Sequence, residues 1–177
     1  KGASVLVSTT THMLVEPDTD LSCDSFAVME KIKKTGYCMA GAVCPENSAK
    51  MQSLPEQMLH DLMKQVDYAL IEADGAKHYA LKYPSEQEPV IPEGTTDVIL
   101  VLGSWDLGKP CKDVVFRFEH MTSALGISGD MKADKQMLQW IWQAYEEKLK
   151  NMDYQGHFHV LLSEKTDQGL VFHTLKE

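Results

Sequence analysis

Residues 67–77 read DYALIEADGAK, and this stretch decides how the chain is interpreted. Its largely apolar residues 68–71 predict a buried strand, and an acidic residue, Glu72, follows directly. In nucleotide-binding α/β proteins, a carboxylate at the end of such a strand holds Mg²⁺ beside the phosphates. Glu72 and Asp74 lie two residues apart, so both side chains point the same way in an extended segment. A solvated loop after a buried strand is the competing interpretation.

An alternation of apolar strands and amphipathic helices extends along the rest of the chain. Further strands are predicted at residues 4–8, 37–43, 97–102 and 157–162. Helices are predicted at residues 21–34, 54–66 (capped by Ser53), 116–125 and 130–150. This order favours an α/β fold of three layers, with a mostly parallel sheet and helices on both faces. We expect a single domain that spans residues 1–177.

Composition and charge exclude several classes of protein. With 177 residues, 44% hydrophobic and 24% charged, the chain suits one globular domain with a sizeable core. Its apolar runs are much shorter than the ~20 residues that cross a bilayer. A net charge of −9 and the lack of a basic face disfavour nucleic acid as a partner. Four cysteines without CxxC spacing predict a reducing, cytoplasmic setting.

Ligands of parallel sheets bind at the carboxyl ends of the strands, so the polar residues there are the candidates for a site. The first predicted strand ends in three hydroxyls and an imidazole, those of Thr9, Thr10, Thr11 and His12. Such groups can position phosphate oxygens or a metal-bound water, and they equally suit a polar strand exit. We expect Thr10 and Thr11 to lie near Glu72 and Asp74.

Residues 103–110, GSWDLGKP, nearly match a phosphate-binding loop. They follow a predicted strand and fit the pattern GxxxxGK. Pro110, however, stands where a Ser or Thr hydroxyl would meet Mg²⁺. Proline also removes one backbone N–H that such a loop uses to bind phosphate. We therefore interpret this segment as a chance match that does not work as a phosphate-binding loop.

Residues 76–96 predict a long loop with three prolines. Loops longer than ~12–15 residues are usually functional or disordered. We expect this one to be ordered through residue 92 and to fold back over the strand ends. Its apolar side chains, which we expect to be buried, are Tyr79, Leu81, Tyr83, Val90 and Ile91. Lys77 and Lys82 are expected to pair with Glu86 or Glu88, or to face a bound anion.

Three blocks of the sequence resemble the YqeC family, accessory proteins of selenium-dependent molybdenum hydroxylases. The blocks are residues 9–13 (TTTHM), residues 67–77 and residues 81–92 (LKYPSEQEPVIP). The last is close to that family's LKxPxxxEPVIP run. Order and spacing agree with the family from about residue 3 to about residue 165.

The resemblance implies a P-loop NTPase-like fold and a role in maturing these hydroxylases or their cofactor. It also implies Mg²⁺ and ATP or GTP as cofactors, and the hydroxylase or cofactor-maturation proteins as partners, without nucleic acid or membrane. Family members usually open with a GxGGKT-type loop between a strand and a helix, so we expect this chain to be a fragment that lacks that unit. The family's His-Arg-x-Glu run appears here as residues 116–119, which keep Arg117 and Glu119 but not the His.

The strand-end pattern and the resemblance together give Glu72, Asp74 and Lys77 as the predicted catalytic residues, and Glu72, Asp74 and Thr10 as the predicted metal ligands. The predicted cofactor-binding residues are Thr9, Thr10, Thr11, His12, Lys82, Glu86, Glu88, Lys109, Arg117 and Glu119. Two alternatives stay open. One is a non-catalytic binding module that presents residues 76–92 to a partner protein or cofactor intermediate. The other is a metal-dependent hydrolase built on His12, Glu72 and Asp74.

Overall fold

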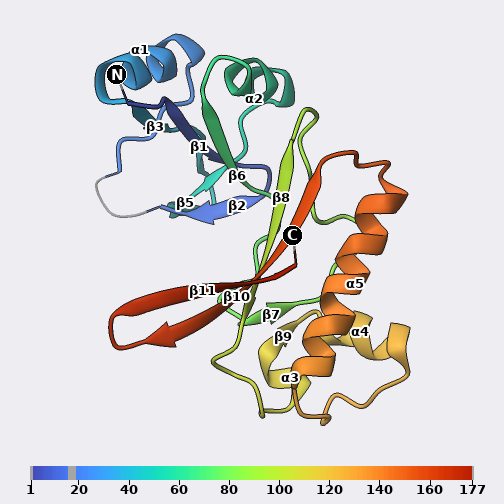
Figure 1. Cartoon of the computed structure of the whole chain (residues 1–177). Coiled ribbons are helices and arrows are strands. Elements are labelled where there is room, and N and C mark those ends of the chain that lie inside the picture. The colour runs from blue at the N-terminus through green and yellow to red at the C-terminus, as the bar shows by residue number, and fades with distance from the viewer. Residues whose placement is uncertain (1, 16–18, 177) are drawn as a thin grey trace. The chain divides into compact units, whose positions relative to one another are not determined.

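A computed structural model describes residues 2–15 and 19–176 of the chain (Figure 1). Its backbone divides into two compact units. Unit 1 consists of Lys1–Gly75 and Pro89–Gly94, and unit 2 consists of Ala76–Glu88 and Thr95–Glu177. The predicted loop is therefore shared: its first part belongs to unit 2 and residues 89–94 belong to unit 1.

Unit 1 is built on a parallel sheet with strand order β3-β1-β6. The strands are β1 (Val5–Thr9), β3 (Tyr37–Met39) and β6 (Tyr68–Glu72), and the helices of this unit are α1 (Ser25–Thr35) and α2 (Glu56–Met63). Leu6 lies opposite Cys38 and Ala69, and all three face the same core. Both helices contribute to this core, through Val28 of α1 and Leu62 of α2. They therefore cover the same face of the sheet.

The helices of unit 1 begin later than predicted. α1 begins at Ser25, because the carboxylate of Asp24 accepts a hydrogen bond from the Ala27 N–H at 2.9 Å and caps the helix there. The prediction that Ser53 caps α2 is wrong. Pro55 is the N-cap, and the Ser53 hydroxyl donates to the carbonyl of Leu54 instead.

A small antiparallel sheet with strand order β2-β5-β4 completes unit 1. Its strands are β2 (His12–Leu14), β4 (Ala42–Cys44) and β5 (Asn47–Gln52). The strand predicted at residues 37–43 is in fact two strands, β3 and β4, in different sheets. The break lies at Gly41, where a Cβ atom would approach the carbonyl oxygen of Gln52 to 2.9 Å. Only glycine allows this close approach of backbone to backbone.

Unit 2 contains a mixed sheet with strand order β11-β10-β8 (Figure 1). β8 (Asp97–Gly103) and β10 (His157–Thr166) are parallel, while β11 (Gly169–Lys176), which was not predicted, forms a hairpin with β10. Two short strands, β7 (Leu81–Lys82) and β9 (Val115–Phe116), also pair in parallel. The helices are α3 (Cys111–Val114), α4 (Phe118–Leu125) and α5 (Lys135–Asn151).

The core of unit 2 lies between its sheet and α5. Leu102 and Val160 from the sheet join Met137 and Ile141 from α5, and all four are buried. α5 begins five residues later than predicted, because the Asp134 side chain accepts a hydrogen bond from the Met137 N–H and caps the helix.

The predicted α/β class is confirmed. The predicted arrangement of three layers, with one mostly parallel sheet between helices, is not. Within the described residues, the strands pair into four sheets of two or three strands. Hydrophobic periodicity locates a strand without naming its neighbour, so the sequence overestimated the size of the sheet. Among the helices of the described residues, none is long and apolar enough to cross a bilayer.

Candidate functional site

The carboxyl ends of β1 and β6 meet in unit 1, as the sequence predicted. Thr9 ends β1, Glu72 ends β6, and the two residues lie opposite each other in the parallel register. The Thr9 hydroxyl donates to Glu72 Oε2 at 2.7 Å, and the Thr11 hydroxyl donates to the same oxygen at 2.6 Å. Two hydroxyl donors therefore fix the orientation of one carboxylate at the edge of the sheet.

Thr10 takes a different direction from its neighbours. Its hydroxyl donates to the carbonyl of Val90 at 2.8 Å, and its N–H donates to the carbonyl of Glu72 at 2.9 Å. The hydroxyls at the carboxylate thus belong to Thr9 and Thr11, whereas the sequence singled out Thr10 and Thr11. His12 begins β2 and is exposed.

Gly75 lies close to the Glu72 carboxylate. A Cβ atom at Gly75 would lie 3.1 Å from Glu72 Oε1 and 4.0 Å from the Thr11 hydroxyl oxygen. A side chain at this position would press on the carboxylate, so glycine suits this close approach. Asp74 follows β6 and is partly buried.

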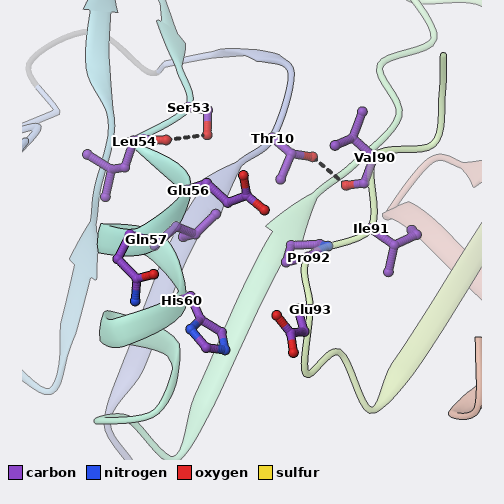
Figure 2. A pocket seen from close by; sticks show the side chains of 11 residues that line it. Thr10, Ser53, Leu54, Glu56, Gln57, His60, Val90, Ile91, Pro92 and Glu93 are labelled. Atoms are coloured by element: carbon purple, nitrogen blue, oxygen red, sulfur yellow. Dashed lines mark hydrogen bonds between the residues drawn. The ribbon is translucent and has the colours of Figure 1, made fainter.

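A cavity of about 650 Å³ adjoins Thr10 in unit 1 (Figure 2). One wall is the start of α2, with Glu56, Gln57 and His60, and the other is the segment of residues 90–93. Figure 2 shows the carboxylates of Glu56 and Glu93 projecting into the space between these walls. Its volume is in the range of small-molecule sites. The cavity combines hydrogen-bonding groups with two negative charges.

The segment that forms the second wall is held by its backbone. The Val90 N–H donates to the carbonyl of Ala73 at 3.1 Å, and the Val90 carbonyl accepts from Thr10. This part of the loop therefore folds back over the strand ends, as predicted. The expected burial of its side chains is only partly right: Leu81 is 2% exposed, but Val90 is 43% and Tyr79 is 41% exposed.

The remaining predicted residues lie in unit 2, where several surround the ring of Phe116. Lys77, Lys82 and Arg117 carry their charges 5.0, 5.4 and 5.2 Å from the ring centroid. Glu88 Oε2 accepts from Lys82 Nζ at 2.7 Å and pairs with Arg117 Nη2 at 2.8 Å. Of the pairings predicted for Lys77 and Lys82 with Glu86 or Glu88, that of Lys82 with Glu88 is found. Partial burial raises the pKa of Glu88, but the hydrogen bonds and charges of Lys82 and Arg117 outweigh it and hold that pKa below its usual value.

Three predicted residues make other contacts. Lys109 pairs with Asp106 inside its own loop at 2.5 Å. Glu86 is exposed, and its carbonyl accepts from Lys148 Nζ. Glu119 is exposed in the first turn of α4. The structure thus divides the predicted site residues between the two units. One group surrounds Glu72 in unit 1, and the other surrounds Phe116 in unit 2.

The sequence interpretation missed the α2 wall of the cavity. A signal was present: a helix that precedes a parallel strand begins at the edge where that strand ends. Gln57 and His60 follow the start of α2 closely and were therefore candidates. Phe116 could not be recognised from the sequence, because nothing there marks a ring that several cations surround.

The described residues contain no group of three or more His, Cys, Asp or Glu side chains placed to hold a metal ion. The predicted ligands Glu72, Asp74 and Thr10 would thus need oxygen atoms from water or a bound ligand to complete a magnesium site. In proteins, Mg²⁺ usually keeps several waters and binds through one or two carboxylates plus substrate phosphates.

Comparison with known proteins gives two matches. A family model described as "YqeC protein" matches residues 1–119. A curated relative, "Uncharacterized protein YqeC" of Escherichia coli (strain K12), is 31% identical over 137 residues. These residues are 73% of this chain and 53% of the relative, so the chain spans about half the length of that protein. No solved structure matches the chain significantly.

Proposed function

Because the chain belongs to the YqeC family, we propose that it is part of a cytoplasmic accessory factor for the maturation of selenium-dependent molybdenum hydroxylases or their cofactor. In this proposal, unit 1 supplies the carboxylate half of a Mg-nucleotide site in a P-loop NTPase-like fold. The observation that carries the proposal is the Glu72 carboxylate, held at the end of a parallel strand by two threonine hydroxyls.

The geometry at Glu72 suits a magnesium-bound water. The hydroxyls of Thr9 and Thr11 donate to Oε2, while Oε1 lies close to Gly75. A carboxylate that is already oriented loses little freedom when it binds the metal, which favours binding. In nucleotide-binding α/β proteins, a strand-end carboxylate of this kind holds Mg²⁺ next to the phosphates.

The cavity beside Thr10 supports a ligand of nucleotide size. Its two carboxylates, Glu56 and Glu93, would repel phosphates that entered it. The uncharged nucleoside would therefore occupy the cavity, and the phosphates would lie toward the strand ends.

The direct test is Mg²⁺-dependent binding of ATP and GTP to the full-length protein, measured by calorimetry. We expect Glu72→Gln to weaken the Mg²⁺-dependent binding at least tenfold, because it removes one metal-binding charge. Glu30→Gln on the exposed face of α1 is the matched control and should bind as the wild type does. Unchanged binding by the Glu72→Gln variant, with an intact far-UV spectrum, would refute the site.

The pathway is tested by expressing a selenium-dependent molybdenum hydroxylase with and without the full-length protein. Hydroxylase activity and selenium content should fall when the protein is absent, and equal values would reject the role in maturation. The binding-module alternative is favoured by the contacts of Lys82 and Arg117 with Glu88, which tie the 76–88 segment to α4 and its N-cap residue Arg117. It would be the better account if Glu72→Gln supported full maturation.

A further inference from the structure

The cavity of unit 1 has one carboxylate on each wall. The helix dipole accounts for the position of only one of the two. Glu56 lies in the first turn of α2, where a negative charge is stabilised by the helix dipole. Glu93 lies in an irregular segment and is exposed. Within the ranges that the structure describes, its side chain makes no hydrogen bond or ion pair. Glu93 therefore has no partner among the described residues, although it projects into the cavity (Figure 2).

The charges restrict what can enter. A phosphate or carboxylate group would meet like charge from Glu56 and Glu93. An uncharged ring that carries N–H donors would instead satisfy a carboxylate, which only accepts hydrogen bonds. Pro92 and Leu59 supply apolar surface for such a ring. The cavity thus selects for a neutral, donor-bearing heterocycle.

We propose that Glu93 reads the 2-amino-4-oxo-pyrimidine edge of a fused heterocycle, the edge that guanine and pterins share. This edge presents a ring N–H and an amino N–H side by side, and the two oxygens of a carboxylate match them as a bidentate pair. Adenine presents one donor next to a lone pair, and that lone pair would face the second carboxylate oxygen. The inference rests on the proposed function only in taking the cavity as the nucleoside site.

Nucleosides test this without involving the magnesium site, because they carry no phosphate. We would titrate the 177-residue chain with guanosine, inosine, adenosine and 6-hydroxymethylpterin, and follow backbone amide shifts by NMR. Guanosine or the pterin should bind at least tenfold more tightly than adenosine, with shifts at residues 53–60 and 90–93. Inosine, which lacks the 2-amino group, should lose most of the advantage. Comparing guanosine with the pterin shows which of the two sources the cavity prefers.

Two variants decide which carboxylate is responsible. Glu93→Gln should abolish the preference for guanosine over adenosine. Glu56→Gln is the matched control, because it removes an equal charge from the opposite wall and should keep the preference. Equal binding of guanosine and adenosine by the wild type would overturn the proposal, as would an unchanged preference in Glu93→Gln. Neither result would affect Mg²⁺-dependent triphosphate binding at Glu72, so the two proposals fail separately.

Discussion

Replacing Thr9 with valine removes a hydroxyl from the strand-end site and leaves the shape of the side chain nearly unchanged. Thr9 is fully buried, at 0% exposure. Its hydroxyl oxygen donates to the Glu72 carboxylate and accepts the Thr11 N–H at 2.9 Å. Valine therefore deprives the carboxylate of one of its two hydroxyl donors and leaves the Thr11 N–H without its acceptor.

The cost follows from these two losses. A hydrogen bond to a charged group contributes about 1.5–3 kcal/mol, and an unsatisfied buried donor costs about 1–3 kcal/mol. Glu72 and Thr11 are only partly buried, so water compensates in part. We expect unit 1 to lose about 2–4 kcal/mol of its free energy of unfolding. Thr10→Val is the matched control: it removes one bond to a neutral carbonyl, which is worth about 0.5–1.5 kcal/mol.

The assay must report on unit 1. All three tryptophans, Trp105, Trp140 and Trp142, belong to unit 2, so their fluorescence follows that unit. Hydrogen exchange with mass spectrometry on peptides covering residues 5–9 and 68–72 reads unit 1 directly. Since about 1.4 kcal/mol is tenfold, exchange should be about 30-fold or more faster in Thr9→Val and at most about tenfold faster in Thr10→Val. Equal effects of the two substitutions would refute the reasoning.

Three further predictions concern binding, packing and acid stability. The 177-residue chain should bind ATP or GTP no better than millimolar, because a phosphate loop supplies several charge-assisted hydrogen bonds of about 1.5–3 kcal/mol each, and the only GxxxxGK segment ends in Pro110; low-micromolar, Mg²⁺-dependent binding in calorimetry would contradict this. Ile141→Ala should cost about 2–5 kcal/mol in urea unfolding followed by tryptophan fluorescence, because Ile141 is fully buried, while Gln139→Ala on the exposed face of α5 should stay within about 0.5 kcal/mol of the wild type. The pKa of Glu88 is lowered in the folded protein, so its contribution to stability is present above its unfolded pKa of about 4.3 and is lost as the pH falls through the lower folded value; the stability gap between the wild type and Glu88→Gln should therefore narrow as the pH falls below about 4.3.

Local patterns in the sequence were sufficient for the elements that carry the strand-end site. The apolar residues that identify β1 and β6 are consecutive in the sequence, so each strand could be predicted from its own segment. The acidic residue Glu72 marks the end of β6. Because parallel strands end at one edge of a sheet, Glu72 and the threonines at the end of β1 could be expected together. Opposite charges close in sequence also allowed a pairing of Lys82 with Glu86 or Glu88 to be expected, and the structure has Glu88.

Only the tertiary structure decided which strands pair and what surrounds the site. Periodicity is a property of neighbouring residues, whereas pairing depends on contacts between residues far apart in the chain. The sequence therefore predicted one sheet where the strands form four. The cavity joins α2 to residues 90–93, which are about thirty residues further along the chain. The backbone N–H and carbonyl of Val90 form its hydrogen bonds with Ala73 and Thr10. Since nearly every residue has these backbone groups, the identity of residue 90 could not predict the contacts.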